Sequence, residues 1–182
     1  MDPHRGEDPA GDKTGSVIEV RDAEPADLAT VEQIYAAAAA TSTATFDEVG
    51  YPAAWWRATL EATDPERGHL LLVAVSPGGA VMGYAKSGRF RDKDAYRTTC
   101  ETSLYVGEGH RGAGVGRALY RGLLERLDSG QLRLAVAGIT QPNEVSNRLH
   151  RSLGFTDVGT FTGVGVKFGR PLDVLWFQRP LS

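Results

Sequence analysis

The sequence predicts a mixed α/β domain in which helices flank a central sheet, and three observations indicate this class. Short apolar runs, such as Leu70–Val75 and Leu132–Ala137, have the length and composition of buried strands. Between them lie segments with apolar residues at helical spacing, as in Val115–Leu127. With 182 residues, 41% of them hydrophobic and 24% charged, the chain is large enough for one domain with a sizeable core.

The N-terminal half is predicted to hold two helices and four strands. Pro25 suits the first position of a helix, and apolar residues recur at helical spacing after it through Tyr35. Pro77-Gly78-Gly79 predicts a turn that reverses the chain between two strands. The elements are, in order, a strand over residues 17–21, a helix from Pro25, a helix over 52–60, and strands over 70–75, 81–85 and 98–106.

The C-terminal half is predicted to hold the remaining helices and strands. The helix that begins near Val115 carries an apolar residue at every fourth position through Leu127. A shorter helix over 143–153 ends at Gly154, and its predicted apolar face consists of Val145, Leu149 and Leu153. Strands over 132–137, from Phe155 onward, and over 173–178 bring the total to about seven strands and four helices, which implies a mixed sheet between helices.

Composition and charge exclude several classes of function. A net charge of −3 provides no concentrated basic surface for nucleic acid, and no run approaches the roughly 18 apolar residues of a membrane span. Cys100 is the single cysteine, so we expect no internal disulfide and a reducing, cytoplasmic location. The histidines show no metal-ligand spacing, so no metal is expected. Residues 1–15 are rich in proline, glycine and charge, which predicts a flexible leader before a single domain over 16–182.

The stretch from Arg111 to Arg117 gives the strongest indication of a ligand. It follows the strand that ends at Val106, opens a helix, and has glycines at every second position. Glycines let backbone N–H groups approach a bulky anion, and a helix start adds unpaired N–H groups and the positive end of its dipole. The predicted pyrophosphate contacts are Arg111, Gly112, Ala113, Gly114, Val115, Gly116 and Arg117.

The glycine spacing separates this stretch from two other phosphate-binding motifs. A dinucleotide fingerprint requires G-x-G-x-x-G, whereas the glycines here alternate with other residues. Gly109 and Gly114 have P-loop spacing, but Val115 and Gly116 stand where that motif has Lys and Ser/Thr. A purely structural strand-to-helix turn remains the alternative at this point.

A polar pattern lies on the helix over 143–153. Asn143, Ser146 and His150 fall at i, i+3 and i+7, so they share one helical face. Such a face suits either ligand contact or solvent, and the segment alone does not separate the two.

Together these segments resemble the GNAT superfamily of N-acetyltransferases. Residues 111–117 resemble its R-G-x-G-[VI]-G-[RKST] loop, and residues 143–155 resemble N-x-x-S-x-x-L-H-x-x-L-G-F of the phosphinothricin and methionine sulfone acetyltransferases. Residues 101–106 resemble that subfamily's E-x-S-[VL]-Y-V strand. Residues 163–173 resemble its G-x-K-F-G-R-W-L-D segment, with Pro171 in place of Trp. The order of elements over 17–182 resembles the GNAT order as well.

The resemblance implies a GNAT fold with a mixed, mostly antiparallel sheet, and acetyl-CoA as cosubstrate without a metal. It implies that residues 111–117 hold the pyrophosphate, and that Leu104, Tyr105 and Val106 pair with the pantetheine arm. Asn143 and Ser146 would contact the pantetheine and adenosine end. The implied acceptor is the α-amine of a small amino acid or analogue that carries a carboxylate, such as phosphinothricin, methionine sulfoximine or methionine sulfone. The implied assembly is a homodimer.

Acetyl transfer to an amine requires a base, because an amine with a pKa near 10 is only about 0.1% neutral at pH 7. Glu101 is the predicted base, and strand alternation puts it on one face with Ser103 and Tyr105, while Thr102 points to the other. A structural carboxylate paired with an arginine is the alternative. Backbone N–H groups of 104–106 are the predicted oxyanion donors. His150 or Tyr105 is predicted to protonate the thiolate, unless it leaves unprotonated.

Substrate recognition is predicted to come from the segment before Glu101. Residues 90–93 resemble the relatives' W-R-x-F loop, whose arginine region contacts a carboxylate or side-chain anion of the substrate. Arg91 is retained and suits a carboxylate, whereas Lys93 replaces an aromatic residue. The predicted substrate contacts are Arg91, Asp92, Lys93, Thr102 and Ser103. Lys167 and Arg170 either add positive charge from the C-terminal segment or lie on a solvated face.

Three other functions stay open. The first is acetylation of another amine, such as a peptide N-terminus or a polyamine, although Arg91 would repel a polyamine. The second is a non-catalytic acyl-CoA sensor. The third is a Rossmann-type nucleotide binder, which the glycine spacing disfavours.

Overall fold

The computed structural model describes residues 18–182, which build one seven-stranded sheet in the order β1-β2-β3-β4-β5-β7-β6. All neighbouring strands are antiparallel except β4 and β5, which are parallel. The mixed, mostly antiparallel sheet expected from the sequence is therefore confirmed. The predicted leader over 1–15 lies outside the described residues. The strands are β1 (Glu19–Asp22), β2 (Leu70–Val75), β3 (Val81–Arg89), β4 (Thr99–Val106), β5 (Leu134–Thr140), β6 (Thr156–Lys167) and β7 (Arg170–Pro180).

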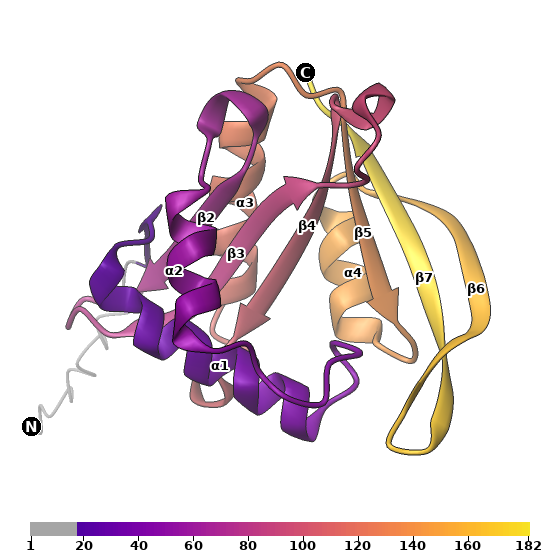
Figure 1. The fold of residues 1–182 in the computed structure, drawn as a ribbon, viewed down its shortest axis with the longest axis horizontal. Helices are drawn as coiled ribbons and strands as arrows, with labels where there is room; N and C mark the ends of the chain where they lie inside the picture. The colour runs from indigo at the N-terminus through magenta and orange to yellow at the C-terminus, as the bar shows by residue number, and fades with distance from the viewer. Residues whose placement is uncertain (1–17) are drawn as a thin grey trace, which may run out of the picture.

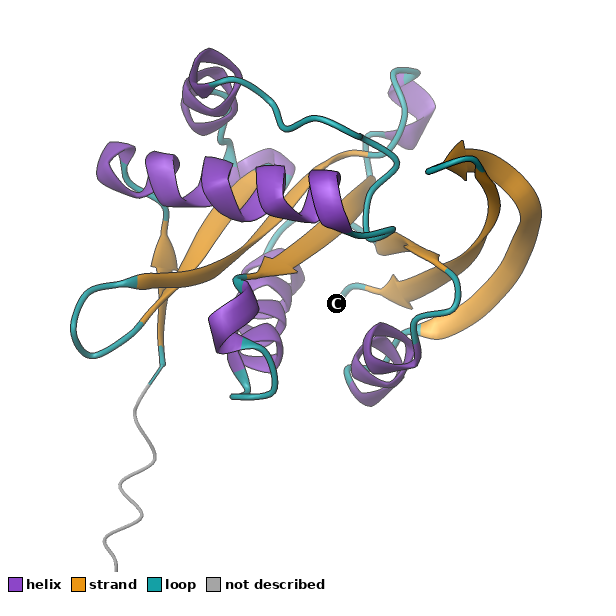
Figure 2. Ribbon diagram, turned by 90° about the horizontal axis from the view of Figure 1, so that it is seen from below, coloured by secondary structure: helices purple, strands orange, loops and turns teal. Residues whose placement is uncertain are grey.

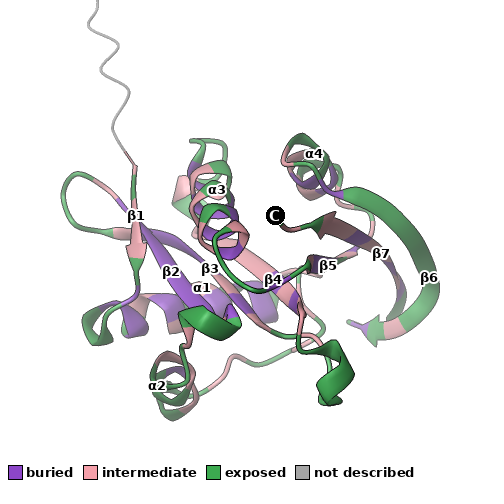
Figure 3. Ribbon diagram, turned by 90° about the horizontal axis from the view of Figure 1, so that it is seen from above, coloured by how far each residue is buried: buried purple, intermediate pink, exposed green. Residues whose placement is uncertain are grey.

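Four α-helices in the described part of the chain cover the two faces of the sheet (Figure 1). Helices α1 (Leu28–Thr41) and α2 (Ala53–Glu61) pack on one face, and α3 (Val115–Asp128) and α4 (Glu144–Ser152) on the other (Figure 2). Every residue of β2 is buried because helices cover both of its faces, as the apolar run at 70–75 predicts (Figure 3). The larger core lies between the sheet and the α3 side.

Strands β4 and β5 stay together over only part of their length. Thr99–Glu101 pairs with Leu134–Val136, after which β4 continues beside β3 alone and β5 continues beside β7 (Figure 1). Residues 102–106 of β4 therefore have no partner strand on their β5 side. Backbone N–H and C=O groups left free in this way are available to a ligand.

The apolar face predicted for α4 is partly wrong. Val145 is 73% exposed, whereas Asn147 and His150 are buried. At 3.6 residues per turn, Val145 lies almost opposite the centre of the side that faces the sheet. Leu149 and Leu153 lie at the border of that side, and both pack against the larger core.

The last two strands form a long hairpin at the edge of the sheet. Phe168 and Gly169 have φ angles of 51° and 69° at its turn, as a tight hairpin requires. β6 curves away from the rest of the sheet, and most of its residues are exposed (Figure 3). β6 and β7 are 12 and 11 residues long, so they extend well beyond the short segment predicted over 173–178.

Candidate active site

The glycine loop leads directly into the first turn of α3. Gly112 and Gly114 have φ angles of 79° and 85°, and a Cβ at either position would meet nothing within 4 Å. Glycine is required there by the backbone, and the space beside both residues is open. Ala118 N–H donates to the Gly114 carbonyl, so the N–H groups of the three preceding residues have no partner within the helix. No side chain caps this helix start and no acidic residue lies in its first turn.

Gly116 brings this helix start against the end of β4. A Cβ at Gly116 would lie 3.3 Å from Leu104 Cδ2 and 3.7 Å from Val106 Cγ2. The absence of a side chain at Gly116 therefore permits the close approach. Val115 is buried, so only its backbone can meet a ligand, while Arg111 and Arg117 are exposed. The predicted pyrophosphate loop and the predicted pantetheine segment thus lie side by side.

Glu101 lies on the opposite face of β4, toward α1 and α2. In the β3–β4 register Glu101 pairs with Gly88, Ser103 with Lys86, and Tyr105 with Tyr84. Burial raises the pKa of the Glu101 carboxyl, and the positive charges of Arg91 and Lys86 oppose that rise. Within residues 18–182 Glu101 forms no direct ion pair with an arginine, and Arg91 acts on it through its charge alone. A half-buried carboxyl with a raised pKa is suited to accept a proton.

Three polar atoms on this side of the sheet are buried without a hydrogen-bond partner in the described part of the chain. They are the Tyr84 hydroxyl on β3, Trp176 Nε1 on β7 and Trp56 Nε1 on α2, which packs against Tyr84. Trp176 pairs with Gly138 of β5, which leaves room for the indole ring at 3.2 Å from an added Cβ. Unsatisfied buried donors are uncommon in proteins, and here they lie on the face that carries Glu101.

A connecting segment over residues 42–47 borders the same face. Tyr105 OH donates to the Ala44 carbonyl at 3.5 Å, and Tyr35 OH contacts both Thr45 Oγ1, at 3.0 Å, and the Asp47 carboxylate. Burial raises the pKa of Tyr105 to about 12, so its hydroxyl stays protonated at neutral pH. Of the two proton donors predicted from the sequence, Tyr105 is the one on the Glu101 face.

Lys167 holds this segment in place, and both expectations for it are wrong. Its side chain is neither solvated nor directed at a ligand, since the residue is 1% exposed. Its Nζ lies 2.6–2.8 Å from the carbonyl oxygens of Ala39, Ser42, Thr45 and Asp47. Ala39 and Ser42 belong to the C-terminal end of α1, where unpaired carbonyls attract a cation. Arg170 is exposed, in agreement with the alternative that it lies on a solvated face.

His150 lies in the core behind β4 and not at the Glu101 face. It is 2% exposed, its ring stacks on Phe177, and its Nε2 lies 2.9 Å from Tyr120 OH. Its Nδ1 lies 2.8 Å from the Ser146 carbonyl, and burial lowers its pKa. The prediction of His150 as a direct catalytic residue is corrected accordingly, because both ring nitrogens have partners within the core.

Thr102 belongs to the same buried network. Its Oγ1 lies 3.0 Å from Tyr120 OH and donates to the Val136 carbonyl at 3.2 Å. The side chain therefore faces away from Glu101, and its prediction as a substrate contact is wrong. Tyr120 links Thr102 to His150 and was not singled out from the sequence. A tyrosine on the buried side of a helix is a usable signal, because its hydroxyl requires a partner.

Asn143 and Ser146 have structural contacts of their own. Asn143 Oδ1 accepts the Ser146 N–H at 3.1 Å and so caps α4. Ser146 Oγ lies 3.3 Å from His150 Nδ1. Both residues are half-buried, and their contact with a cosubstrate stays a prediction.

The segment after β3 is held by an arginine that sequence reasoning missed. Arg89 donates to the Arg91 carbonyl at 2.8 Å and pairs with Asp94 at 3.1 Å. Arg91 lies over the Phe90 ring at 4.2 Å, and its charge acts on Glu101. Asp92 and Lys93 are exposed. Arg91 is exposed as well, and it acts on Glu101 through its charge without a direct contact, so the three substrate contacts stay a prediction.

Comparison with known proteins agrees with this geometry. Residues 31–155 match the acetyltransferase (GNAT) family. The chain belongs to this family.

Several GNAT proteins are similar to this chain over much of its length. The phosphinothricin N-acetyltransferase of Streptomyces coelicolor is 50% identical over 56% of the chain. That match covers 59% of the Streptomyces protein, which is less than two thirds of its length. The L-methionine sulfoximine/L-methionine sulfone acetyltransferase of Pseudomonas paraeruginosa is 39% identical over 90% of this chain and 94% of its own.

A solved GNAT structure is similar in fold as well. The phosphinothricin acetyltransferase of Sinorhizobium meliloti, solved in complex with acetyl-CoA, superposes with a TM-score of 0.84. It is 36% identical, and the match covers 91% of this chain and 89% of that one. The open cradle at Gly112 and Gly114 fits a pyrophosphate group such as that of acetyl-CoA.

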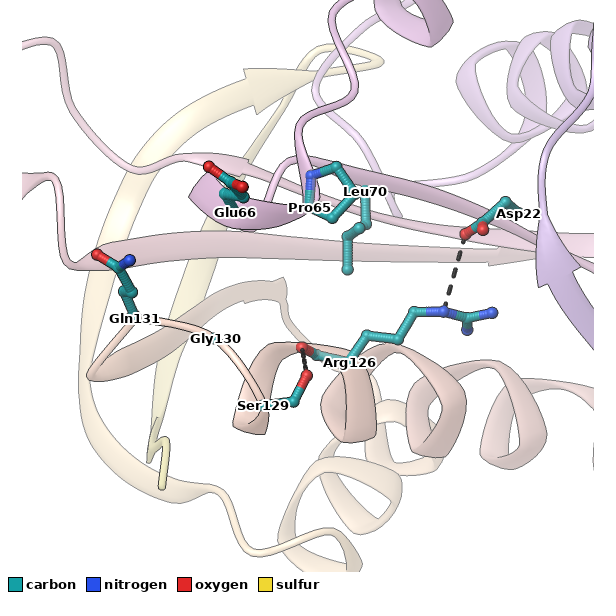
Figure 4. Close-up of a pocket in the computed structure, with 8 residues that line it drawn as sticks. All are labelled: Asp22, Pro65, Glu66, Leu70, Arg126, Ser129, Gly130 and Gln131. Atoms are coloured by element: carbon teal, nitrogen blue, oxygen red, sulfur yellow. Dashed lines mark hydrogen bonds and ion pairs between the residues drawn. The ribbon is translucent and has the colours of Figure 1, made fainter.

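Two surface hollows lie apart from the glycine loop. The larger, of about 600 Å³, lies between the C-terminal end of α3 and the start of β2 and includes Arg126 and Asp22 (Figure 4). It lies at the other end of α3 from Gly114 and is therefore separate from the glycine loop. The smaller, of about 190 Å³, includes Trp55, Lys86 and Gly88 and so borders the Glu101 face. No His, Cys, Asp and Glu cluster within residues 18–182 has the arrangement of a metal site, and no helix there is long and apolar enough to cross a membrane.

Proposed function

We propose that this GNAT protein transfers the acetyl group of acetyl-CoA to the α-amine of a small amino acid or analogue, of the phosphinothricin, methionine sulfoximine or methionine sulfone type. The observation that carries the proposal is Glu101, a half-buried carboxyl with a raised pKa and no ion-pair partner in the described residues. It lies on the strand whose end packs against the glycine loop through Gly116. The names of the similar proteins support this acceptor class.

In the proposed reaction the amine nitrogen attacks the thioester carbonyl, the C–S bond breaks, and the thiolate departs. Glu101 accepts the amine proton, directly or through one water. Backbone N–H groups of Leu104 and Val106, which point away from β3 and lack a partner strand on the β5 side, would stabilise the oxyanion. The N–H groups at the start of α3 would hold the pyrophosphate, with Arg111 and Arg117 beside them.

Arg91 is the proposed partner of the substrate's α-carboxylate, since a guanidinium can donate two parallel hydrogen bonds to a carboxylate. Its electrostatic effect on Glu101 supports its presence at the same site. We further propose one catalytic domain over residues 16–182 that works as a homodimer in the cytoplasm, where acetyl-CoA is available. Inactivation of an antibiotic-like amino acid is the physiological role that the acceptor class suggests.

A panel of amines, followed by release of the CoA thiol, tests the acceptor class. We expect turnover with methionine sulfone, methionine sulfoximine or phosphinothricin and none with polyamines. Turnover with polyamines alone would reject the acceptor class, and tight acetyl-CoA binding without turnover of any amine would favour a sensor.

Calorimetry with acetyl-CoA tests the glycine loop. Gly114→Ala places a Cβ on a residue with a φ of 85°, and we expect acetyl-CoA affinity to fall by roughly tenfold, as a cost of about 1–2 kcal/mol predicts. Gly109→Ala is the matched control, because Gly109 has open space and no positive φ. Equal affinity of both variants with the wild type would remove this loop from the binding site.

A further inference from the structure

Lys86 is a cation at the Glu101 face that the proposed reaction does not use. It lies on β3 opposite Ser103, one diagonal step from Glu101 on the same face. Its side chain is half-buried, and Nζ lies 5.2 Å from the centre of the Trp55 ring. Within residues 18–182 it forms no ion pair. A half-buried ammonium without a hydrogen-bonded partner is costly, which points to a partner that arrives with the substrate.

The charges around Lys86 are few. Glu101 and Asp47 are the two carboxylates whose charges act on it, and burial outweighs both and lowers its pKa. Asp47 already accepts a hydrogen bond from Tyr35 OH. Arg91 is the other cation that acts on Glu101. The single α-carboxylate of an amino-acid substrate can bind one of these two cations, Arg91 or Lys86. The other cation is then available to bind a second anionic group of the substrate.

Space for that group borders Lys86. The hollow of about 190 Å³ is lined by Lys86, Trp55, Thr59, His69 and Gly88, among others. Gly88 is the cross-strand partner of Glu101, and a Cβ there would meet nothing within 4 Å. The hollow therefore includes the cross-strand neighbour of Glu101, although Glu101 itself does not line it.

We propose that Lys86 is a specificity-determining residue that binds an anionic group on the side chain of the amino-acid substrate. This inference rests on the proposed function. It predicts that the protein prefers a substrate with a charged side-chain terminus to a neutral one of the same shape.

Two substrates of nearly equal shape test the inference. Phosphinothricin ends in an anionic methylphosphinate and methionine sulfone in a neutral methylsulfone, on the same carbon chain. We expect wild-type kcat/KM to be higher for phosphinothricin at pH 8. In Lys86→Met, kcat/KM for phosphinothricin falls by roughly tenfold or more, as loss of a charge-assisted hydrogen bond predicts, while kcat/KM for methionine sulfone changes by less than about threefold.

The control variants distinguish binding of the substrate's side-chain anion from a general effect of Lys86 on activity. Lys86→Arg keeps the charge and is expected to keep the preference. Arg57→Met removes an exposed positive charge from α2 and is expected to leave the ratio unchanged. Equal losses for both substrates in Lys86→Met, or a wild-type preference for methionine sulfone, would overturn the inference. Failure of the wild type to acetylate either substrate would instead reject the proposed function.

Discussion

Opposing influences act on the carboxyl group of Glu101. Burial favours its neutral form, and the positive charges of Arg91 and Lys86 favour its ionised form. Burial is the larger influence, so the pKa lies above its ordinary value. A carboxylate in this position is a stronger base than an exposed one.

Glu101→Gln tests this role, because the amide has nearly the same shape and cannot accept the proton. We expect turnover to fall by roughly 10²-fold or more, with acetyl-CoA affinity kept. In the wild type, activity is lost as the pH falls through the raised pKa of Glu101, and the variant lacks this acid limb. Steady-state rates between pH 5 and 9 measure both effects, and an unchanged rate in Glu101→Gln at pH 7 would remove Glu101 as the base.

At the scale of elements, the β6–β7 hairpin supports the connection between α1 and α2. Lys167 binds the carbonyls at the end of α1, and the ring of Phe46 packs on Gly165 of β6. The connection in turn carries Ala44, whose carbonyl accepts from Tyr105 on β4. Three segments far apart in the sequence therefore determine the position of one border of the Glu101 face.

Two glycines of β6 provide a test of that support. A Cβ at Gly165 would lie 2.4 Å from Phe46 Cε1, whereas a Cβ at Gly159 would meet nothing within 4 Å. We expect Gly165→Ala to displace the 42–47 segment and raise KM for the amine several-fold, with KM for acetyl-CoA unchanged. Gly159→Ala is the control, and we expect it to keep the wild-type KM for the amine and for acetyl-CoA. Equal kinetics in the two variants would show that β6 does not position this border.

Lys167→Met measures what the buried ammonium contributes to stability. It leaves the carbonyls at the end of α1 without their cation, and we expect the free energy of unfolding to fall by about 2–4 kcal/mol. Urea unfolding gives this value. A change of less than about 0.5 kcal/mol, as expected for a surface lysine, would contradict the buried role.

Periodicity correctly predicts the buried face of those elements whose buried positions are apolar. Leu70–Val75 is apolar throughout because both faces are covered, and the apolar stripe of α3 is buried as predicted. α4 departs from its pattern because it buries Asn147 and His150 and exposes Val145. Alternation along β4 placed Glu101 and Thr102 on opposite faces. The same alternation points the Thr102 side chain away from the Glu101 face, so it already argued against Thr102 as a substrate contact. In the structure the Thr102 hydroxyl lies in the core.

The buried position of Lys167 could not be predicted from the sequence. Its partners are backbone carbonyls more than 100 positions earlier in the chain, with separations of 120 to 128 residues. Every residue has a backbone carbonyl, so the sequence does not show which carbonyls bind a side chain. A buried lysine that binds carbonyls therefore has the same local sequence pattern as an exposed lysine. The contacts of Arg89 with the backbone of the next loop were missed for the same reason.

At the scale of the whole molecule, β6 is an edge strand with an apolar surface. Val158, Phe161, Val164 and Val166 of this strand are 54–66% exposed. Exposed edge strands with apolar side chains tend to pair with another chain, and proteins usually cover them. This supports the proposed homodimer, in which a second copy covers β6.

Sedimentation equilibrium at micromolar concentration tests the dimer. We expect the wild type to sediment as a dimer of the 19.5 kDa chain. Phe161→Asp places a charge on the exposed face of β6, and burial of an unpaired charge in an interface is costly, so this variant should be monomeric. Val145→Asp is the control, because Val145 is 73% exposed near the N-terminal end of α4 and does not belong to β6. A monomeric wild type, or a dimeric Phe161→Asp variant, would mean that β6 is not the interface, and its apolar side chains would then face solvent.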